Sequence, residues 1–124
     1  MRDQKLSVPP RSVFASLVLA ADGHSLTVNE MSNQIVELRK TLPLDTSDIS
    51  IRADRGGWIS DDLASFVYRL VLFGFATDDP LELSDEGRDL CIEILKEESS
   101  KCPGEIKELL AAVKLQLPEA ELTA

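Results

Sequence analysis

The sequence has few aromatic residues, one histidine and few glycines, and each shortage excludes a kind of core or site. Aromatic residues make up 5% of the 124 residues, so a core must be built mainly from Leu, Val, Ile and Ala side chains. A single histidine, His24, excludes the two-histidine zinc motifs of metalloproteases. The six glycines form neither a dinucleotide-binding GxGxxG motif nor a phosphate-binding loop before Lys-Ser/Thr. We therefore expect no enzyme, no cofactor and no metal site.

Cysteines and long apolar runs are also scarce. Cys91 and Cys102 form no CxxC pair, and Cys91 falls among the apolar positions of an expected helix, as a reduced thiol commonly does. The longest apolar stretch, residues 13–21, is far shorter than the roughly 20 residues of a membrane span. Asp3 and the prolines before that stretch do not fit a secretory signal peptide. We expect a cytoplasmic protein with no membrane attachment.

Acidic residues are in excess, and the excess lies in one half of the chain. The sequence has 22 acidic and 13 basic residues, a formal net charge of −9. Residues 1–57 contain seven of each, whereas residues 58–124 contain fifteen acidic and six basic residues. Such asymmetry marks either an interaction surface or a well-solvated acidic face. It disfavours general binding to polyanions, because phosphate binding needs local positive charge.

Five helices are predicted from apolar residues that recur three and four positions apart. Pro10 and Gly23 are typical of the entrance and the exit of the first helix. Thr27 and Glu30 predict a capping box at the start of the second helix, and Ser60 predicts a cap for the third. The expected helices span residues 11–22, 28–41, 60–73, 85–98 and 104–116, with residues 99–104 as the break before the last.

Strand signals occur in two places between the helices. Residues 48–52 alternate like a short exposed strand, and the following Gly56-Gly57 pair signals a turn. Residues 75–77 and 81–83 flank a loop of two aspartates and a proline, which predicts a β-hairpin. The expected fold class is mainly α with a small β-hairpin. The expected divisions are a flexible N-terminus (1–9), a domain (10–98), a C-terminal helix (104–117) and a tail (118–124).

The order of these elements resembles a winged helix-turn-helix. Residues 63–76, LASFVYRLVLFGFA, resemble the helix, small-residue turn and first wing strand of the MarR and PadR groups of regulators. Residues 83–88, LSDEGR, resemble the junction where the wing of those proteins runs into the next helix. The resemblance covers residues 10–98 and implies a winged helix with an additional C-terminal helix. The long connection before the third helix departs from the compact turn of those regulators.

A DNA-reading winged helix needs cations or amides on its recognition helix and cations on its wing. The expected exposed positions of the third helix and the hairpin loop carry four carboxylates and one arginine, which repel a duplex. We therefore expect a non-enzymatic module that binds another protein, as an adaptor or regulatory subunit, through its acidic C-terminal half. The candidate partner-binding residues are Asp61, Asp62, Ser65, Arg69, Asp78 and Asp79.

Two other functions stay open. A transcription regulator would bind duplex DNA through its N-terminal and linker cations, since local potential counts more than net charge. An acidic inhibitor would mimic nucleic acid and occupy a basic site on another protein. The candidate phosphate-binding residues for the regulator are Arg39, Lys40, Arg52 and Arg55.

The last helix has two interpretations. Its apolar positions advance by three and four residues and share one face. If that face is exposed, the helix forms a homodimer, because soluble monomers seldom expose such a patch. If instead the helix folds back on the first helix, it closes the core of its own chain. The residues of this stripe are Ile106, Leu109, Leu110, Val113 and Leu117.

Overall fold

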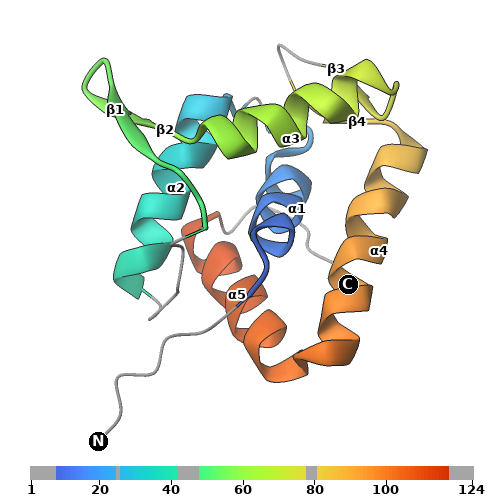
Figure 1. The fold of residues 1–124 in the computed structure, drawn as a ribbon. Helices are drawn as coiled ribbons and strands as arrows, with labels where there is room; N and C mark the ends of the chain where they lie inside the picture. Colours follow the sequence, from blue (N-terminus) through green and yellow to red (C-terminus); the bar gives the residue numbers. More distant parts are fainter. Residues whose placement is uncertain (1–7, 25, 42–47, 78–80, 118–124) are drawn as a thin grey trace, which may run out of the picture.

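Helices dominate the fold, and two short hairpins join them (Figure 1). The computed structural model describes residues 8–24, 26–41, 48–77 and 81–117. The helices are α1 (Pro10–Ala21), α2 (Val28–Thr41), α3 (Asp61–Leu72), α4 (Asp85–Lys101) and α5 (Pro103–Gln116). The strands are β1 (Arg52–Asp54), β2 (Gly57–Ile59), β3 (Ala76–Thr77) and β4 (Glu82–Leu83), paired antiparallel as β1–β2 and β3–β4. The expectation of a mainly helical chain with a small β-hairpin is confirmed.

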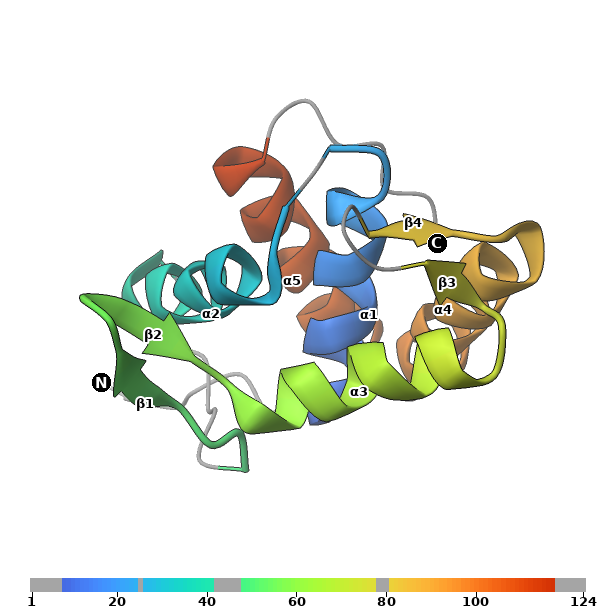
Figure 2. The same ribbon diagram turned by 90° about the horizontal axis from the view of Figure 1, so that it is seen from above.

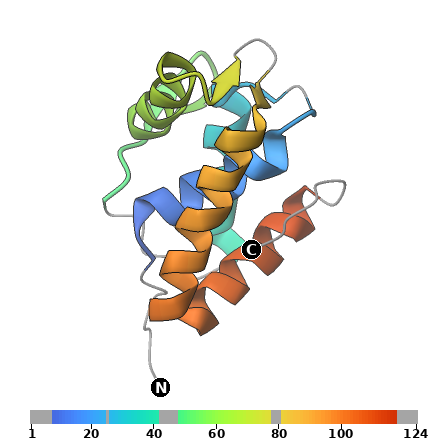
Figure 3. The same cartoon turned by 90° about the vertical axis from the view of Figure 1, so that its right-hand side faces the viewer.

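Helix α1 forms the centre of the core. Ten of its twelve residues are buried, and it contacts each of the other four helices in the described part of the chain. Figures 2 and 3 show α2, α3, α4 and α5 arranged around it. A helix that is apolar all round needs cover on every side. Its buried Ser16 is satisfied locally, because the Ser16 hydroxyl donates to the carbonyl of Val13 at 2.8 Å.

The predicted caps account for the helix starts. The amide of Glu30 donates to Thr27 Oγ1 at 3.1 Å, and the Glu30 carboxylate accepts from the Thr27 amide at 2.8 Å. This is the predicted capping box. The Ser60 hydroxyl accepts from the Leu63 amide at 3.2 Å and caps α3. The bounds of α1, α2 and α3 agree with the sequence prediction to within one residue at each end.

The predicted break between the last two helices is wrong in extent. Helix α4 runs to Lys101 rather than to residue 98, and only Cys102 separates it from α5. The Ser100 hydroxyl donates to the Glu97 carbonyl at 2.7 Å, so this serine is accommodated inside the helix. Pro103 then ends α4, because the residue before a proline avoids helical geometry. The same proline starts α5, where its missing N–H costs nothing.

The strand expected at residues 48–52 lies instead at Arg52–Asp54, and its partner strand β2 was not predicted. Arg55 and Gly56 join the two strands and both have positive φ, 48° and 83°. Two positive φ values in a two-residue loop define a type I′ turn, which Asn-Gly usually signals. Arg55 occupies the first position of this turn, where asparagine is common, so the turn residues did not predict the hairpin.

The ends of the chain and the tip of the second hairpin lie partly outside the described residues. The predicted tail, residues 118–124, is outside them, as are residues 1–7 of the predicted flexible N-terminus. The remaining part of that N-terminus does not fit the prediction. Val8 is 7% exposed and belongs to the core, because α1 begins two residues later and draws the preceding chain onto it.

Helix α5 closes the core of its own chain. It packs against α1, α2 and α4, and Ile106, Leu109 and Val113 are buried. Leu110 and Leu117 are half-buried and pack against the same core. The interpretation of this stripe as an exposed dimer helix therefore loses its basis, since α1 already covers it. The second interpretation, a return onto the first helix, agrees with the packing.

Candidate functional site

The solvent-facing side of α3 carries the partner-binding residues that the sequence predicted within the described range. Asp61, Asp62, Ser65 and Arg69 are all exposed, as expected. With 3.6 residues per turn, they fall opposite the buried Leu63, Val67 and Leu70. Two further candidates, Asp78 and Asp79, lie outside the described residues.

The two aspartates at the start of α3 bind the preceding segment of the chain. Arg52 donates to both carboxylate oxygens of Asp61, at 3.0 and 3.2 Å. This hydrogen-bonded pair lowers the pKa of Asp61. Asp62 Oδ2 accepts from the Ser50 amide at 2.8 Å. Both carboxylates also face the positive end of the α3 dipole, so structural roles account for much of their placement.

Ser65 and Arg69 line a shallow groove between α1 and α3. The groove has a volume of about 290 Å³, and Arg11, Phe14 and Asp62 also contribute to its walls. Two hydrogen bonds to α4 orient the guanidinium of Arg11. Its Nε donates to Glu98 Oε2 at 3.0 Å, and its Nη2 donates to Glu97 Oε1 at 2.9 Å. Arg69 forms no salt bridge within the described part of the chain.

The sequence analysis missed an apolar cluster at the end of α3. Tyr68, Leu72 and Phe73 are 64%, 62% and 69% exposed. Tyr68 and Leu72 lie four residues apart and share one side of the helix. The sequence contained a signal for this exposure. The spacing of Tyr68 and Leu72 places both away from the side of α3 that buries Leu63 and Leu70. Soluble proteins carry scattered apolar residues, but here Tyr68 and Leu72 share one side of α3 and Phe73 follows at its C-cap, so three large exposed apolar residues gather at one helix end.

The start of α4 is fixed against the turn that follows this cluster. The Phe75 amide donates to the Leu70 carbonyl at 2.7 Å, and the Phe75 carbonyl accepts from the Ser84 amide at 2.9 Å. A Cβ atom at Gly87 would lie 1.9 Å from that carbonyl oxygen, so only glycine fits there. The LSDEGR junction therefore holds the first turn of α4 beside the end of α3.

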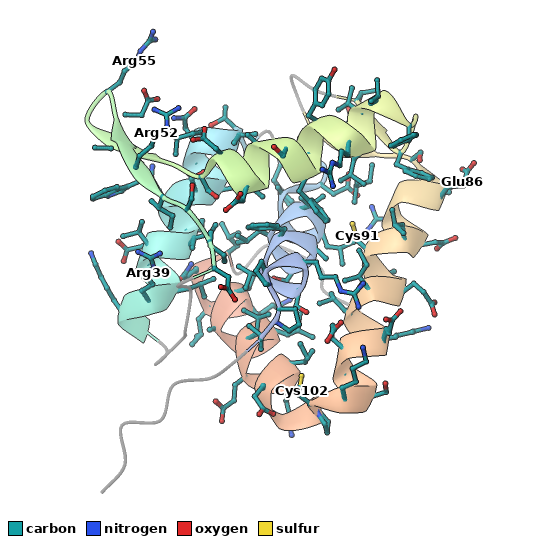
Figure 4. All side chains as sticks on the ribbon, viewed as in Figure 1. Arg39, Arg52, Arg55, Glu86, Cys91 and Cys102 are labelled. Atoms are coloured by element: carbon teal, nitrogen blue, oxygen red, sulfur yellow. The ribbon has the colours of Figure 1, made fainter. Side chains whose placement is uncertain are left out.

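Acidic side chains surround the first turns of α4. Asp85, Glu86 and Asp89 are exposed, and none forms a salt bridge with another described residue. Figure 4 shows Glu86 where the end of α3 and the start of α4 meet. Arg88 differs from these residues because it pairs with Asp22 at the end of α1. We call Tyr68, Leu72, Phe73, Asp85, Glu86 and Asp89 together the corner surface.

The predicted phosphate-binding residues lie on another side of the molecule. Figure 4 shows Arg39, Arg52 and Arg55 on the side formed by α2 and the β1–β2 hairpin, away from Glu86. Lys40 pairs with Glu37 at 3.2 Å, and Arg52 pairs with Asp61. The cations thus share one side of the fold, but carboxylates neutralise at least two of them. Arg55 is exposed in the turn of the hairpin.

A second hollow, of about 440 Å³, lies between this hairpin and α2 and includes the exposed indole of Trp58. Its polar groups bind the hairpin to the helix. The Trp58 amide donates to Asn33 Oδ1 at 3.1 Å, and Asn29 Nδ2 donates to Asp54 Oδ2 at 3.2 Å. These contacts give the hollow a structural explanation, and the sequence had predicted neither asparagine.

The described residues hold neither a cluster for a metal ion nor a thiol whose pKa is lowered. They contain no cluster of three or more His, Cys, Asp or Glu side chains able to hold a metal ion. Burial raises the pKa of the Cys91 thiol to about 12, so it remains protonated at neutral pH. Desolvation also raises the pKa of the half-buried Cys102.

No family model, curated protein or solved structure matches this chain. None of the helices in the described ranges combines the length and apolar character required to cross a bilayer.

Proposed function

We propose that this chain is a non-enzymatic protein-binding module, an adaptor or regulatory subunit, and that the corner surface contacts the partner. The observation that carries the proposal is the exposure of Tyr68, Leu72 and Phe73, each more than three-fifths exposed. The chain has only six aromatic residues, and two of them lie in this patch. Aromatic residues are enriched where protein surfaces meet, and they supply much of the binding energy there.

A winged-helix architecture is part of the same proposal. Helix α3 is followed by the β3–β4 hairpin and then by α4, the order of a recognition helix, a wing and the next helix. The close approach of Gly87 to Phe75 at the wing junction supports this assignment. The β1–β2 hairpin inserted between α2 and α3 distinguishes the chain from the compact regulators it resembles.

The distribution of charge favours a protein partner over DNA. A duplex-reading α3 needs several cations or amides on its exposed side, and the described α3 offers one cation, Arg69. The cations of the α2 side include Lys40 and Arg52, which are engaged by carboxylates of the same chain. Phosphate contacts there would have to compete with those ion pairs.

Cross-linked capture from the source cells tests the proposal, with three tagged forms of the chain compared. The wild type is expected to capture a partner, and Leu72→Asp to lose it, because a buried aspartate at an interface leaves an uncompensated charge. Leu115→Asp is the matched control, since Leu115 is 76% exposed on α5, outside the corner surface. The proposal fails if Leu72→Asp retains every protein captured by both the wild type and the control.

A further inference from the structure

We infer that the corner surface takes a basic amphipathic helix of another protein. This inference rests on the proposed function and specifies the chemistry of the partner. Two independent features of the surface support it, the arrangement of its apolar side chains and the sign of the charges beside them.

The apolar side chains define the binding face of the occupant. Tyr68 and Leu72 lie on successive turns of α3, and Phe73 follows at the end of the helix. A helix presents residues at positions i, i+3, i+4 and i+7 along one side, which matches a short row of apolar contacts. A segment with this spacing would cover the patch with two or three apolar anchors.

The charges beside the patch define the flanks of the occupant. Asp85, Glu86 and Asp89 surround the start of α4 and have no salt-bridge partner in the described ranges. Lysine or arginine residues next to the apolar anchors would pair with these carboxylates. Complementary charge of this kind speeds association and selects among partners.

The same carboxylates argue against other occupants. A second copy that packed apolar patch on apolar patch would bring two sets of acidic side chains together, and like charges facing each other are costly. Nucleic acid and anionic lipid carry the same sign as these three carboxylates, and Arg69 is the one exposed cation of the described α3 beside the apolar residues. A basic protein segment satisfies both the apolar and the acidic part.

The surface is held in one arrangement before binding. Phe75 is bonded to Leu70 and to Ser84, and Gly87 packs on its carbonyl. The positions of α3 and α4 relative to each other are therefore set by backbone contacts rather than by the partner. Little ordering is needed on binding, which favours affinity.

A displayed library of random 18-residue peptides provides the probe. Peptides are selected on the full-length wild-type chain and then counter-selected on the Leu72→Asp variant. We expect peptides with helical apolar spacing and an excess of Lys and Arg. Their affinity should fall about tenfold for Glu86→Gln/Asp89→Asn and should weaken with added salt. Glu105→Gln/Glu108→Gln on α5 removes the same charge elsewhere and should leave the affinity unchanged.

The outcomes separate the inference from the proposed function. Peptides that depend on Leu72 but carry no basic excess, or that ignore Glu86→Gln/Asp89→Asn, would overturn the basic partner and leave the binding surface in place. Selection that returns no Leu72-dependent peptide would overturn both. Light scattering that finds a wild-type dimer, dissociated by Leu72→Asp, would overturn the basic partner in favour of a second copy.

Discussion

Helices α3 and α5 each carry apolar residues at helical spacing, yet they use them differently. The stripe of α5 was a candidate interface and lies in the core. The exposed side of α3 was expected to be polar, yet it carries Tyr68 and Leu72, which together with Leu115 are the most exposed large apolar residues of the described helices. Periodicity identifies which residues share a face, but what covers that face depends on the other elements.

The difference follows from α1. Because α1 is buried on nearly every side, the fold needs an element on each flank, and α5 supplies one of them. Helix α3 covers α1 with Leu63, Val67 and Leu70. Tyr68 and Leu72 fall outside that contact and stay in solvent.

The largest expected effect comes from introducing an aspartate into α5, compared with a second variant that carries an aspartate in α3. Leu109→Asp places an unpaired charge in the core and should unfold the protein, with a loss of roughly 4 kcal/mol or more. Leu72→Asp should change the free energy of unfolding by less than about 1 kcal/mol, because the site is exposed. Urea unfolding followed by circular dichroism measures both. Equal losses would contradict the contrast between the helices.

The second prediction tests the packing that holds α4 beside α3. Gly87→Ala forces a methyl group against the Phe75 carbonyl and should cost about 3 kcal/mol through displacement of the helix. Gly104→Ala is the matched change in α5, where nothing lies within 4 Å of the added atom. It should be neutral or stabilise by up to about 1 kcal/mol. Thermal unfolding of both variants decides, and a tolerant Gly87 position would refute the fixed corner.

The third prediction concerns the ion pairs that join α1 to the end of α4. Among the described residues, Arg11→Met leaves the buried carboxylate of Glu98 with Lys101 as its remaining cation, at 3.9 Å, and should cost roughly 1–3 kcal/mol. Arg11→Met/Glu98→Gln should recover much of that loss, since the uncompensated charge is removed. A double variant as unstable as the single one would show that packing of the Arg11 stem matters more.

The same ion pairs predict a dependence on pH. Arg11 lowers the pKa of Glu97 below its unfolded value, so this pair contributes stability that is fully present above the unfolded pKa. That contribution is lost as the pH falls through the lowered folded-state pKa. Between about pH 4 and pH 3, below the usual glutamate pKa of roughly 4.3, the wild type should lose more stability than Arg11→Met. Parallel slopes for the two proteins would contradict this.

The smallest expected effect lies in the β1–β2 turn. Arg55 has a φ of 48°, a region that costs a residue with a Cβ about 1 kcal/mol. Arg55→Asn should therefore stabilise the chain by about 0.5–1 kcal/mol, because asparagine suits this position of the turn. Arg55→Lys is the control and should change little. Destabilisation by asparagine would point to a contact made by the guanidinium.

Local sequence signals predicted much of the fold. The Thr27–Glu30 capping box and the Ser60 cap gave the helix starts, because capping depends on neighbouring residues. The β1–β2 hairpin was missed because its turn uses Arg55. The end of α4 was misplaced because the serines predicted a break, whereas they continue the helix up to Lys101 and the residue before Pro103 leaves helical geometry.

The candidate site was predicted less completely, since it depends on contacts between distant segments. Asp61, Asp62, Ser65 and Arg69 are exposed as predicted. The spacing of Tyr68 and Leu72 places them off the buried stripe of α3, but the tertiary structure was needed to show that no other described element covers them. The close approach of Gly87 in the LSDEGR segment to the Phe75 carbonyl also required the tertiary structure.

Hydrogen exchange of the chain, alone and bound to the protein captured by the wild type, tests the central claim most directly. The proposal that the corner surface contacts the partner predicts slower exchange in residues 66–77 and 85–92, with no change in α5 or the β1–β2 hairpin. Protection confined to α5 or to the hairpin would contradict it, because the partner would then occupy another side of the molecule.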